Sequence, residues 1–304
     1  MYKKSRKKMT GYKKKAVIFA TITAFIWGLS FLSIKVAVAV IPPVSLGFIR
    51  FVIASLILAL VFIIKRKKPE LALKDLPLMA GSGFIGVSLY FMGENNGVLL
   101  LSASEASIIV GSIPVLAMIA ERIFVKSSIS RAQYAGAALS VLGVSLLVIE
   151  SLRLSPSPKG YFYMAVAAIS WVAYAFMTKP LTAKYKAMDI TFWHSLFGAM
   201  GFLPFIFGEK LKPAGIDLVV ILNVLYLGIF CSALGYLFYI TSVEALGPGV
   251  SSVFINLIPV VSVIASMLVL DEKLSSIQLF GGAGAIVGVY ITSLTGSTYG
   301  KQKK

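Results

Sequence analysis

The chain has 304 residues, of which 58% are hydrophobic and only 13% are charged, and its mean hydropathy is +0.89. Soluble globular proteins carry about a quarter charged residues, so this composition excludes a soluble enzyme, a disordered chain and a small disulfide-rich domain. The formal net charge is +17, but the basic residues flank apolar segments and do not interleave with aromatic ones, so we expect no nucleic-acid partner. The sequence predicts an integral membrane protein.

Ten apolar segments follow one another along the chain, each long enough to cross the hydrocarbon core, which takes about 20 residues. The predicted spans are 16–39, 44–64, 76–98, 104–125, 131–150, 160–178, 189–208, 217–240, 249–270 and 276–295. The first is too long for a signal peptide, so we expect it to be an uncleaved span. The fold class is therefore predicted as an all-α integral membrane protein with ten transmembrane helices.

Lysine and arginine are distributed unevenly between the two sides of these spans. With the amino terminus inside, the cytoplasmic segments hold 22 of the 29 basic residues. The opposite side holds Arg153, Lys159, Lys210, Lys212 and Lys273. The positive-inside rule then places the basic tail 1–15 and the tail 296–304 in the cytoplasm. We expect a multi-pass protein of the plasma or inner cell membrane.

The two halves of the chain share residues at a nearly constant spacing. The matched pairs are Ser107 and Ser252, Pro114 and Pro259, Gln133 and Gln278, and Gly143 and Gly288 at an offset of 145, and Trp27 and Trp171, Lys35 and Lys179, and Arg50 and His194 at 144. Each half holds five spans, an odd number, so the second half must cross the membrane in the opposite sense. We expect two inverted five-helix repeats, 16–150 and 160–295, as in secondary transporters. A duplication without a transport role is the alternative.

Several short stretches carry a family resemblance. They are Glu94-Asn95-Asn96-Gly97, Ser102-Ala103-Ser104, Ser107 through Pro114, and Leu270-Asp271-Glu272-Lys273-Leu274. Together with the paired repeats they resemble the drug/metabolite transporter superfamily with EamA-type domains, over nearly the whole chain. The resemblance implies a ten-helix transporter of amino acids, other metabolites or drugs, or of nucleotide or phosphorylated sugars as in distant branches. Because the first repeat has Ser127 where the second has Glu272, we expect Glu272 to cap a loop.

Matched interruptions in two spans point to a binding site. Pro114 and Pro259 lie near the middle of their spans, where proline removes a helix hydrogen bond and leaves carbonyl groups free. A wet cavity or neighbouring helices can satisfy those groups. Gly111 and Asn256 share the position three residues earlier. We expect these breaks to mark the substrate site, with a simple packing kink as the alternative.

Trp27 and Trp171 form a matched pair in mid-span, although tryptophan prefers the membrane interface. We expect them to form aromatic walls of a central cavity, and plain helix packing is the alternative. The predicted cavity residues are Trp27, Tyr90, Glu94, Asn95, Ser107, Gly111, Pro114, Trp171, His194, Asn256 and Pro259.

Charged residues inside spans are costly and are functional candidates by default. Lys35, Arg50, Glu94 and Glu105 fall within about two helical turns of the outer face. Because opposite signs occur at similar depth, we expect them to pair with one another in an extracellular gate.

Three further candidates lie near the cytoplasmic face. Lys179 and His194 match Lys35 and Arg50 in the repeat, and Glu244 is also available at this face. Both lysines have an alternative, in which the side chain extends to the interface. For His194 the alternative is a hydrogen bond between helices.

Glu94 is the sharpest single candidate, with Tyr90 one turn earlier on the same helix face and Asn95 directly after it. A carboxyl group at such a depth must pair with a cation or carry a proton. Pairing with Arg50 or Lys35 and proton carriage both stay open, and His194 is the next residue that could titrate near neutrality.

These observations predict a secondary transporter that exports small metabolites or amino acids by alternating access, with protons as a candidate coupling ion. Within the same fold, the alternative is an exchanger of phosphorylated anions with Lys35, Arg50 and Lys179 as ligands. An intramembrane enzyme is disfavoured, because one histidine and one cysteine cannot supply a multi-histidine metal or thiol site. We expect no cofactor and no metal, and the expected partners are a small-molecule substrate and the lipid bilayer.

Overall fold

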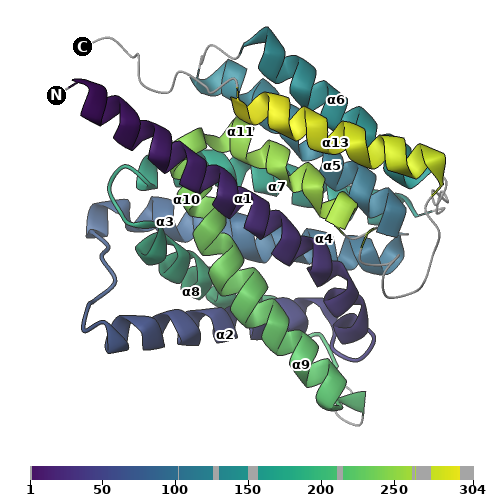
Figure 1. Cartoon of the computed structure of the whole chain (residues 1–304). Helices are drawn as coiled ribbons and strands as arrows, with labels where there is room; N and C mark the ends of the chain where they lie inside the picture. Colours follow the sequence, from purple (N-terminus) through teal and green to yellow (C-terminus); the bar gives the residue numbers. More distant parts are fainter. Residues whose placement is uncertain are drawn as a thin grey trace.

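The structure is a computed structural model that describes residues 2–101, 103–125, 130–149, 157–210, 215–261, 264 and 275–294, and every regular element within them is a helix (Figure 1). The α-helices are α1 (Tyr2–Val38), α2 (Pro43–Ile64), α3 (Leu76–Gly83), α4 (Tyr90–Leu100), α5 (Ala103–Ala120), α6 (Arg131–Val148), α7 (Pro158–Leu181), α8 (Ala187–Ile206), α9 (Leu218–Tyr226), α10 (Tyr236–Leu246), α11 (Pro248–Val253) and α13 (Ser276–Leu294). The predicted spans 44–64 and 160–178 agree with α2 and α7 within three residues. The last part of the predicted span 249–270 and the expected Glu272 cap lie outside the described residues.

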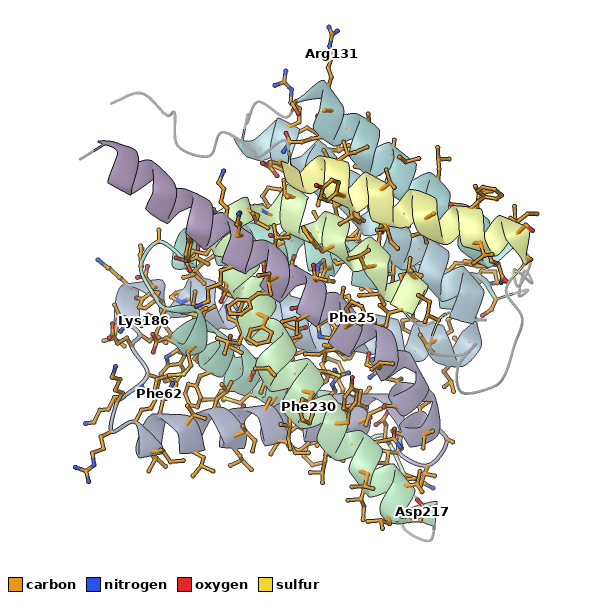
Figure 2. All side chains as sticks on the ribbon, in the orientation of Figure 1. Phe25, Phe62, Arg131, Lys186, Asp217 and Phe230 are labelled. Carbon is orange, nitrogen blue, oxygen red and sulfur yellow. The ribbon has the colours of Figure 1, made fainter. Side chains whose placement is uncertain are left out.

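Four described helical stretches are long and apolar enough to cross a membrane. They are Pro43–Ile64, Leu73–Leu100, Pro158–Leu181 and Leu218–Leu246. Two shorter apolar helices cover Pro248–Val261 and Ser276–Thr292. Large apolar side chains project from the outside of the bundle, including the labelled Phe25 and Phe230 in Figure 2. An outer surface of this kind is suited to lipid and not to water, as the composition predicts.

Two of the long stretches contain a π-helical segment in their middle. Phe84–Leu89 joins α3 to α4, and Leu227–Gly235 joins α9 to α10. The wider π turn is rare and occurs mostly at functional sites. It places Tyr90 and Tyr236 at the first position of the helix that follows. The apolar pattern alone gives no sign of this change of pitch.

Helices α6 and α13 lie side by side at one face of the bundle (Figure 1) and approach closely through glycines. A Cβ atom at Gly143 would lie 2.6 Å from the carbonyl oxygen of Gly281, and one at Gly136 would lie 2.8 Å from that of Gly288. The order of these contacts shows that the two helices run antiparallel. Small residues let helix backbones come together where lipid offers no hydrophobic driving force.

Both of these helices begin with the same capping motif. The Ser130 hydroxyl accepts a hydrogen bond from the backbone N–H of Gln133 at 3.2 Å, and the Gln133 side chain accepts one from the Ser130 N–H at 2.9 Å. Ser275 and Gln278 repeat this exchange at 3.0 and 3.2 Å. A reciprocal cap of this kind satisfies two of the free donors at a helix start.

Helix α2 ends in a tight turn with a left-handed residue. The N–H of Lys67 donates to the carbonyl of Phe62, and the N–H of Arg66 donates to that of Ile63, both at 3.0 Å. Arg66 has φ 49°, in the position that glycine usually occupies in this C-terminal motif. A non-glycine residue is strained there.

The α6–α13 contact leads to a first prediction. We expect Gly143→Ala to lower the free energy of unfolding by about 1–3 kcal/mol, because the new methyl group meets backbone and cannot be accommodated by a side-chain rotation. Gly11→Ala is the matched control, since a Cβ there meets nothing within 4 Å. Thermal unfolding of both purified variants in detergent measures the difference, and equal melting temperatures would contradict the close contact.

Candidate functional site

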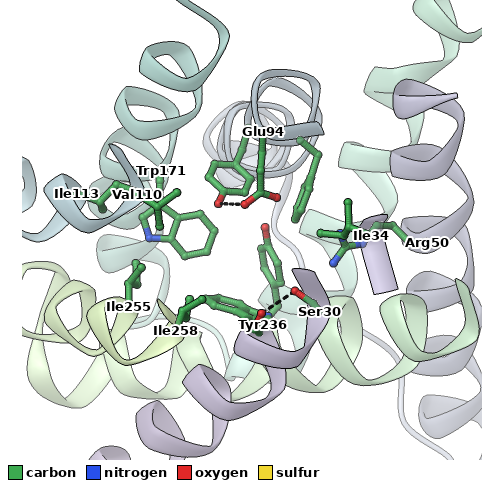
Figure 3. A pocket seen from close by; sticks show the side chains of 13 residues that line it. Ser30, Ile34, Arg50, Glu94, Val110, Ile113, Trp171, Tyr236, Ile255 and Ile258 are labelled. Carbon is green, nitrogen blue, oxygen red and sulfur yellow. Dashed lines mark hydrogen bonds between the residues drawn. The ribbon is translucent and has the colours of Figure 1, made fainter. Parts of the chain in front are cut away.

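A small cavity of about 30 Å³ lies between helices from both halves of the chain (Figure 3). It is bordered by α1, α2, α4, α5, α7, α10 and the 3₁₀ turn Phe254–Asn256 that follows α11. The lining side chains are those of Trp27, Ser30, Ile34, Arg50, Tyr90, Phe91, Glu94, Val110, Ile113, Trp171, Tyr236, Ile255 and Ile258.

Aromatic rings form much of the cavity wall. The rings of Trp27 and Trp171 meet edge to face with their centroids 5.2 Å apart. Tyr236 packs against Trp27 at 5.6 Å, and Tyr90 packs against Trp171 at 4.9 Å. The indole N–H of Trp27 is held by the carbonyl of Cys231 at 3.0 Å. The structure thus brings together the two tryptophans that the repeat singles out.

Arg50 is a buried cation on this wall, with an exposed fraction of 2%. Its Nε donates a hydrogen bond to the hydroxyl of Ser232 at 2.8 Å. Its guanidinium carbon lies 4.3 Å from the ring centroid of Phe91, a cation–π contact that offsets part of the cost of burial. Its Nη1 is buried and has no hydrogen-bond partner within the described part of the chain. The guanidinium therefore keeps an unused donor.

Glu94 is the buried acidic residue of the same cavity, with an exposed fraction of 6%. Its Oε1 accepts a hydrogen bond from the Tyr90 hydroxyl at 2.7 Å. The expected ion pair with Arg50 does not form, because Ser232 and Phe91 hold the guanidinium while Tyr90 holds the carboxylate. Figure 3 shows Glu94 and Arg50 at different parts of the same space.

His194 lies away from the cavity and connects three helices. It is fully buried in α8, its Nε2 is 2.7 Å from the Ser82 hydroxyl of α3, and its Nδ1 is 3.3 Å from the Tyr174 hydroxyl of α7. This arrangement matches the alternative of a hydrogen bond between helices. A lone membrane histidine gives no sequence signal that separates these two roles.

The amide side chains also make structural contacts. Asn95 donates to the carbonyl of Pro43 at 2.9 Å, which ties α4 to the start of α2. Asn256 donates to the hydroxyl of Ser140 in α6 at 2.9 Å. A Cβ atom at Gly111 would lie 3.8 Å from Asn256 Oδ1, so these two repeat-matched residues face each other. Neither amide nor Gly111 lines the cavity.

The two prolines lie directly beside the cavity. Pro114 is inside α5, and its neighbour Ile113 lines the space. Pro259 follows Ile258, which lines it from the other half of the chain. Helix α5 is continuous through Pro114, so the expected interruption is not present there, but a residue beside each proline lines the cavity.

The remaining gate candidates are only partly described. The ammonium of Lys179 donates to the carbonyls of Val243 at 3.0 Å and of Glu244 at 2.6 Å, near the carboxyl end of α10. It therefore stabilises a helix end and does not border the cavity. The side chains of Lys35, Glu105 and Ser107 lie outside the described part of the structure.

Sequence reasoning missed several wall residues. Tyr236 follows the second π segment as Tyr90 follows the first, so a comparison at an offset of 146 would have found it. The wall residues Ser30 and Phe91, and Ser232, which binds Arg50, lie in apolar or small-residue stretches that give no signal. As a whole, the described part of the site offers a buried arginine and a buried glutamate, apart from each other, on aromatic walls.

Comparison with known proteins gives the same class over almost the whole chain. The EamA-like transporter family matches residues 14–149 and again residues 158–294. An "uncharacterized transporter" of Archaeoglobus fulgidus is 31% identical, covering 91% of this chain and 98% of that protein. A solved crystal structure superposes with a TM-score of 0.75 at 16% identity, covering 92% of this chain and 98% of that one, which supports the fold alone.

Two further relatives have names that include a substrate class. A "probable terminal-alkyne amino-acid exporter" of Streptantibioticus cattleyicolor is 26% identical, covering 91% of this chain and 93% of the relative. A "probable amino-acid metabolite efflux pump" of Escherichia coli is 25% identical, covering 91% and 94%. The chain is thus a multi-pass membrane transporter and not an enzyme, and it belongs to the EamA-like transporter family of the drug/metabolite transporter superfamily.

Proposed function

We propose that this protein exports a small zwitterionic metabolite of the amino-acid type from the cytoplasm, by alternating access. The observation that carries this proposal is the pair of buried, opposite charges in one cavity that do not contact each other. A buried charge is costly unless it is paired and hydrogen-bonded. A ligand with one carboxylate and one ammonium group would supply both missing partners at once.

The geometry of each charge suits one end of such a ligand. The unused Nη1 of Arg50 can donate to a carboxylate, and charge-assisted bonds of this kind are among the strongest. Glu94 accepts one hydrogen bond from Tyr90 and retains acceptor capacity for an ammonium. The indoles of Trp27 and Trp171 would pack against an apolar or aromatic side chain of the substrate.

The relatives support the same substrate class. The names of two of them, an exporter and an efflux pump, contain the words amino acid. Each of the two alignments covers more than nine-tenths of this chain and more than nine-tenths of the relative. The similarity therefore extends over the helices that border the cavity.

The alternative substrate, a phosphorylated anion, fits the cavity less well. Such a ligand would need several cations, but Lys179 is engaged at the end of α10. Glu94 adds a negative charge to the wall, which would repel a dianion. Among the lining residues that the structure describes, one basic side chain faces one acidic side chain, which favours a substrate with no net charge.

Alternating access requires two halves that can rock against each other, and we infer an inverted repeat of 16–150 and 160–295 with ten spans. Two antiparallel contacts between the halves support it, α1 with α10 and α4 with α7. The paired π segments, the paired capping motifs at an offset of 145 and the double family match support it as well.

The charge-pair proposal makes a direct prediction for transport. Proteoliposomes with the wild-type protein should exchange a radiolabelled neutral amino acid in a counterflow assay. Arg50→Gln and Glu94→Gln should each reduce exchange at least about tenfold, since a hydrogen bond to a charged group contributes about 1.5–3 kcal/mol. Arg131→Gln and Glu70→Gln are matched controls, because both side chains are exposed, and they should exchange normally.

Competition with modified substrates separates the candidates further. N-acetylated and amidated forms of the amino acid should compete poorly, because each lacks one charge. Effective competition by a sugar phosphate, without competition by amino acids, would contradict the proposal. If Glu94 carries a proton instead, Glu94→Gln should keep counterflow and lose accumulation driven by a pH gradient, and that result would remove the ammonium-binding role.

The proposed orientation, with both termini in the cytoplasm, has its own test. Lys68 and Lys210 are both exposed. The proposed orientation assigns Lys68 to the cytoplasmic side of the membrane and Lys210 to the external side. On a Cys231→Ala background, Lys210→Cys should react with an impermeant thiol reagent in intact cells, whereas Lys68→Cys should react only after permeabilisation. The reverse labelling pattern would invert the topology.

A further inference from the structure

A second cavity lies at the end of the bundle where α2 ends and α8 begins, and its lining is strongly basic. Lys65, Lys67 and Lys68 border it from the loop after α2, and Lys186 borders it from the start of α8. Its volume is about 490 Å³. We propose that this pocket binds the phosphate-bearing headgroup of an anionic membrane lipid. This inference does not depend on the substrate of the central cavity.

The pocket lies at the boundary between an apolar helix and a basic loop. Helix α2 has the highest mean hydropathy of the four described spans, 2.7. Its last residues Ile63 and Ile64 are both 71% exposed, and the basic loop begins at the next position. Lipid headgroups lie at this depth, because an apolar span ends where the hydrocarbon ends. Figure 2 labels Phe62 and Lys186 at this end of the molecule.

The cations of the pocket are available to a ligand. Among the described residues, no carboxylate lies within 4.0 Å of the ammonium groups of Lys65, Lys67 or Lys68. Lys186 is 4.0 Å from Glu70, and both of these side chains are largely exposed. The other acidic lining residue, Asp189, is occupied by the backbone N–H of Glu70 at 3.2 Å. Basic pockets between membrane helices are suited to phospholipid headgroups.

The backbone of the loop gives an independent indication. Arg66 adopts φ 49°, where glycine would be free of strain. The chain nevertheless has a fifth basic side chain there, directly between Lys65 and Lys67. Arg66 is not among the residues that line the pocket, so its side chain adds to the positive charge of the loop beside it. Strain that is retained at one residue often marks a functional site.

The base of the pocket favours a lipid over a soluble phosphate. Phe62 and Met188 line it, and Met188 belongs to one apolar cluster with Phe192. The rings of Phe62 and Phe192 meet edge to face at 5.7 Å. The exposed Ile63 and Ile64 offer a surface along which acyl chains can lie. A free phosphate would use the lysines but would gain nothing from these apolar groups.

Native mass spectrometry of the full-length protein in detergent can measure the affinity for the first bound lipid. The probes are phosphatidylglycerol, phosphatidylcholine as a zwitterionic lipid, and glycerol 3-phosphate as a soluble source of the same group. Each basic residue near the surface contributes about fivefold in affinity. The variant Lys65→Gln/Lys68→Gln/Lys186→Gln should therefore bind phosphatidylglycerol roughly a hundredfold more weakly, with phosphatidylcholine binding unchanged.

The matched control is Lys13→Gln/Lys14→Gln/Lys15→Gln, which removes the same charge from α1 and should keep its affinity for phosphatidylglycerol. An equal loss in both triple variants would overturn the proposal, because it would show only diffuse attraction. Displacement of the lipid by glycerol 3-phosphate would also overturn it, in favour of a soluble phosphorylated ligand. The single variant Lys68→Gln guards against misfolding: because this lining side chain is exposed, its melting temperature should equal that of the wild type while its lipid affinity falls about fivefold. An unchanged affinity in this variant would count against the proposal.

Discussion

A charge inside a membrane protein must find partners, because neither lipid nor packed side chains replace the water that it loses. This constraint sorts the polar groups of the bundle into two kinds. Both ring nitrogens of His194 are within hydrogen-bond distance of hydroxyl groups on neighbouring helices. The ammonium group of Lys179 donates to two backbone carbonyls of α10. Arg50 and Glu94 have one protein hydrogen bond each and border the cavity. The first kind stabilises the scaffold, and the second kind leaves capacity for a ligand.

The cavity exists because small residues bring the surrounding helices into close contact. A Cβ atom at Gly93 would lie 2.7 Å from the carbonyl oxygen of Tyr163, which fixes α4 against α7. One at Gly235 would lie 2.6 Å from Trp27 Nε1, which fixes α10 against α1. These two contacts determine where the facing indoles of Trp27 and Trp171 meet. Glycine in these helices therefore serves the site as well as the packing.

Hydropathy and repeat spacing predict those features of the structure that follow from the order of residues along the chain. The bounds of α2 and the meeting of Trp27 with Trp171 follow from the order of residues and from the offset of 144. Whether Arg50 contacts Glu94 depends instead on which rotamers the neighbours permit, and Phe91 and Ser232 decide this without a sequence signal. The π segments are equally hidden, because one extra residue in a turn leaves an apolar stretch apolar.

The symmetry of the walls and the asymmetry of the charges together define how a substrate would lie. Tyr90 and Tyr236 stand at matched positions and both line the cavity. Four residues later, however, α4 has Glu94 where α10 has Ile240, and Arg50 corresponds to His194, which is engaged elsewhere. Both charges of the cavity therefore come from the first half of the chain. Matched aromatic walls can hold a ligand in either direction, whereas a cation and an anion on one side orient its polar end. The second half then contributes contacts that are mainly aromatic and apolar. In the alternating-access mechanism that we propose, such contacts could slide without breaking an ion pair.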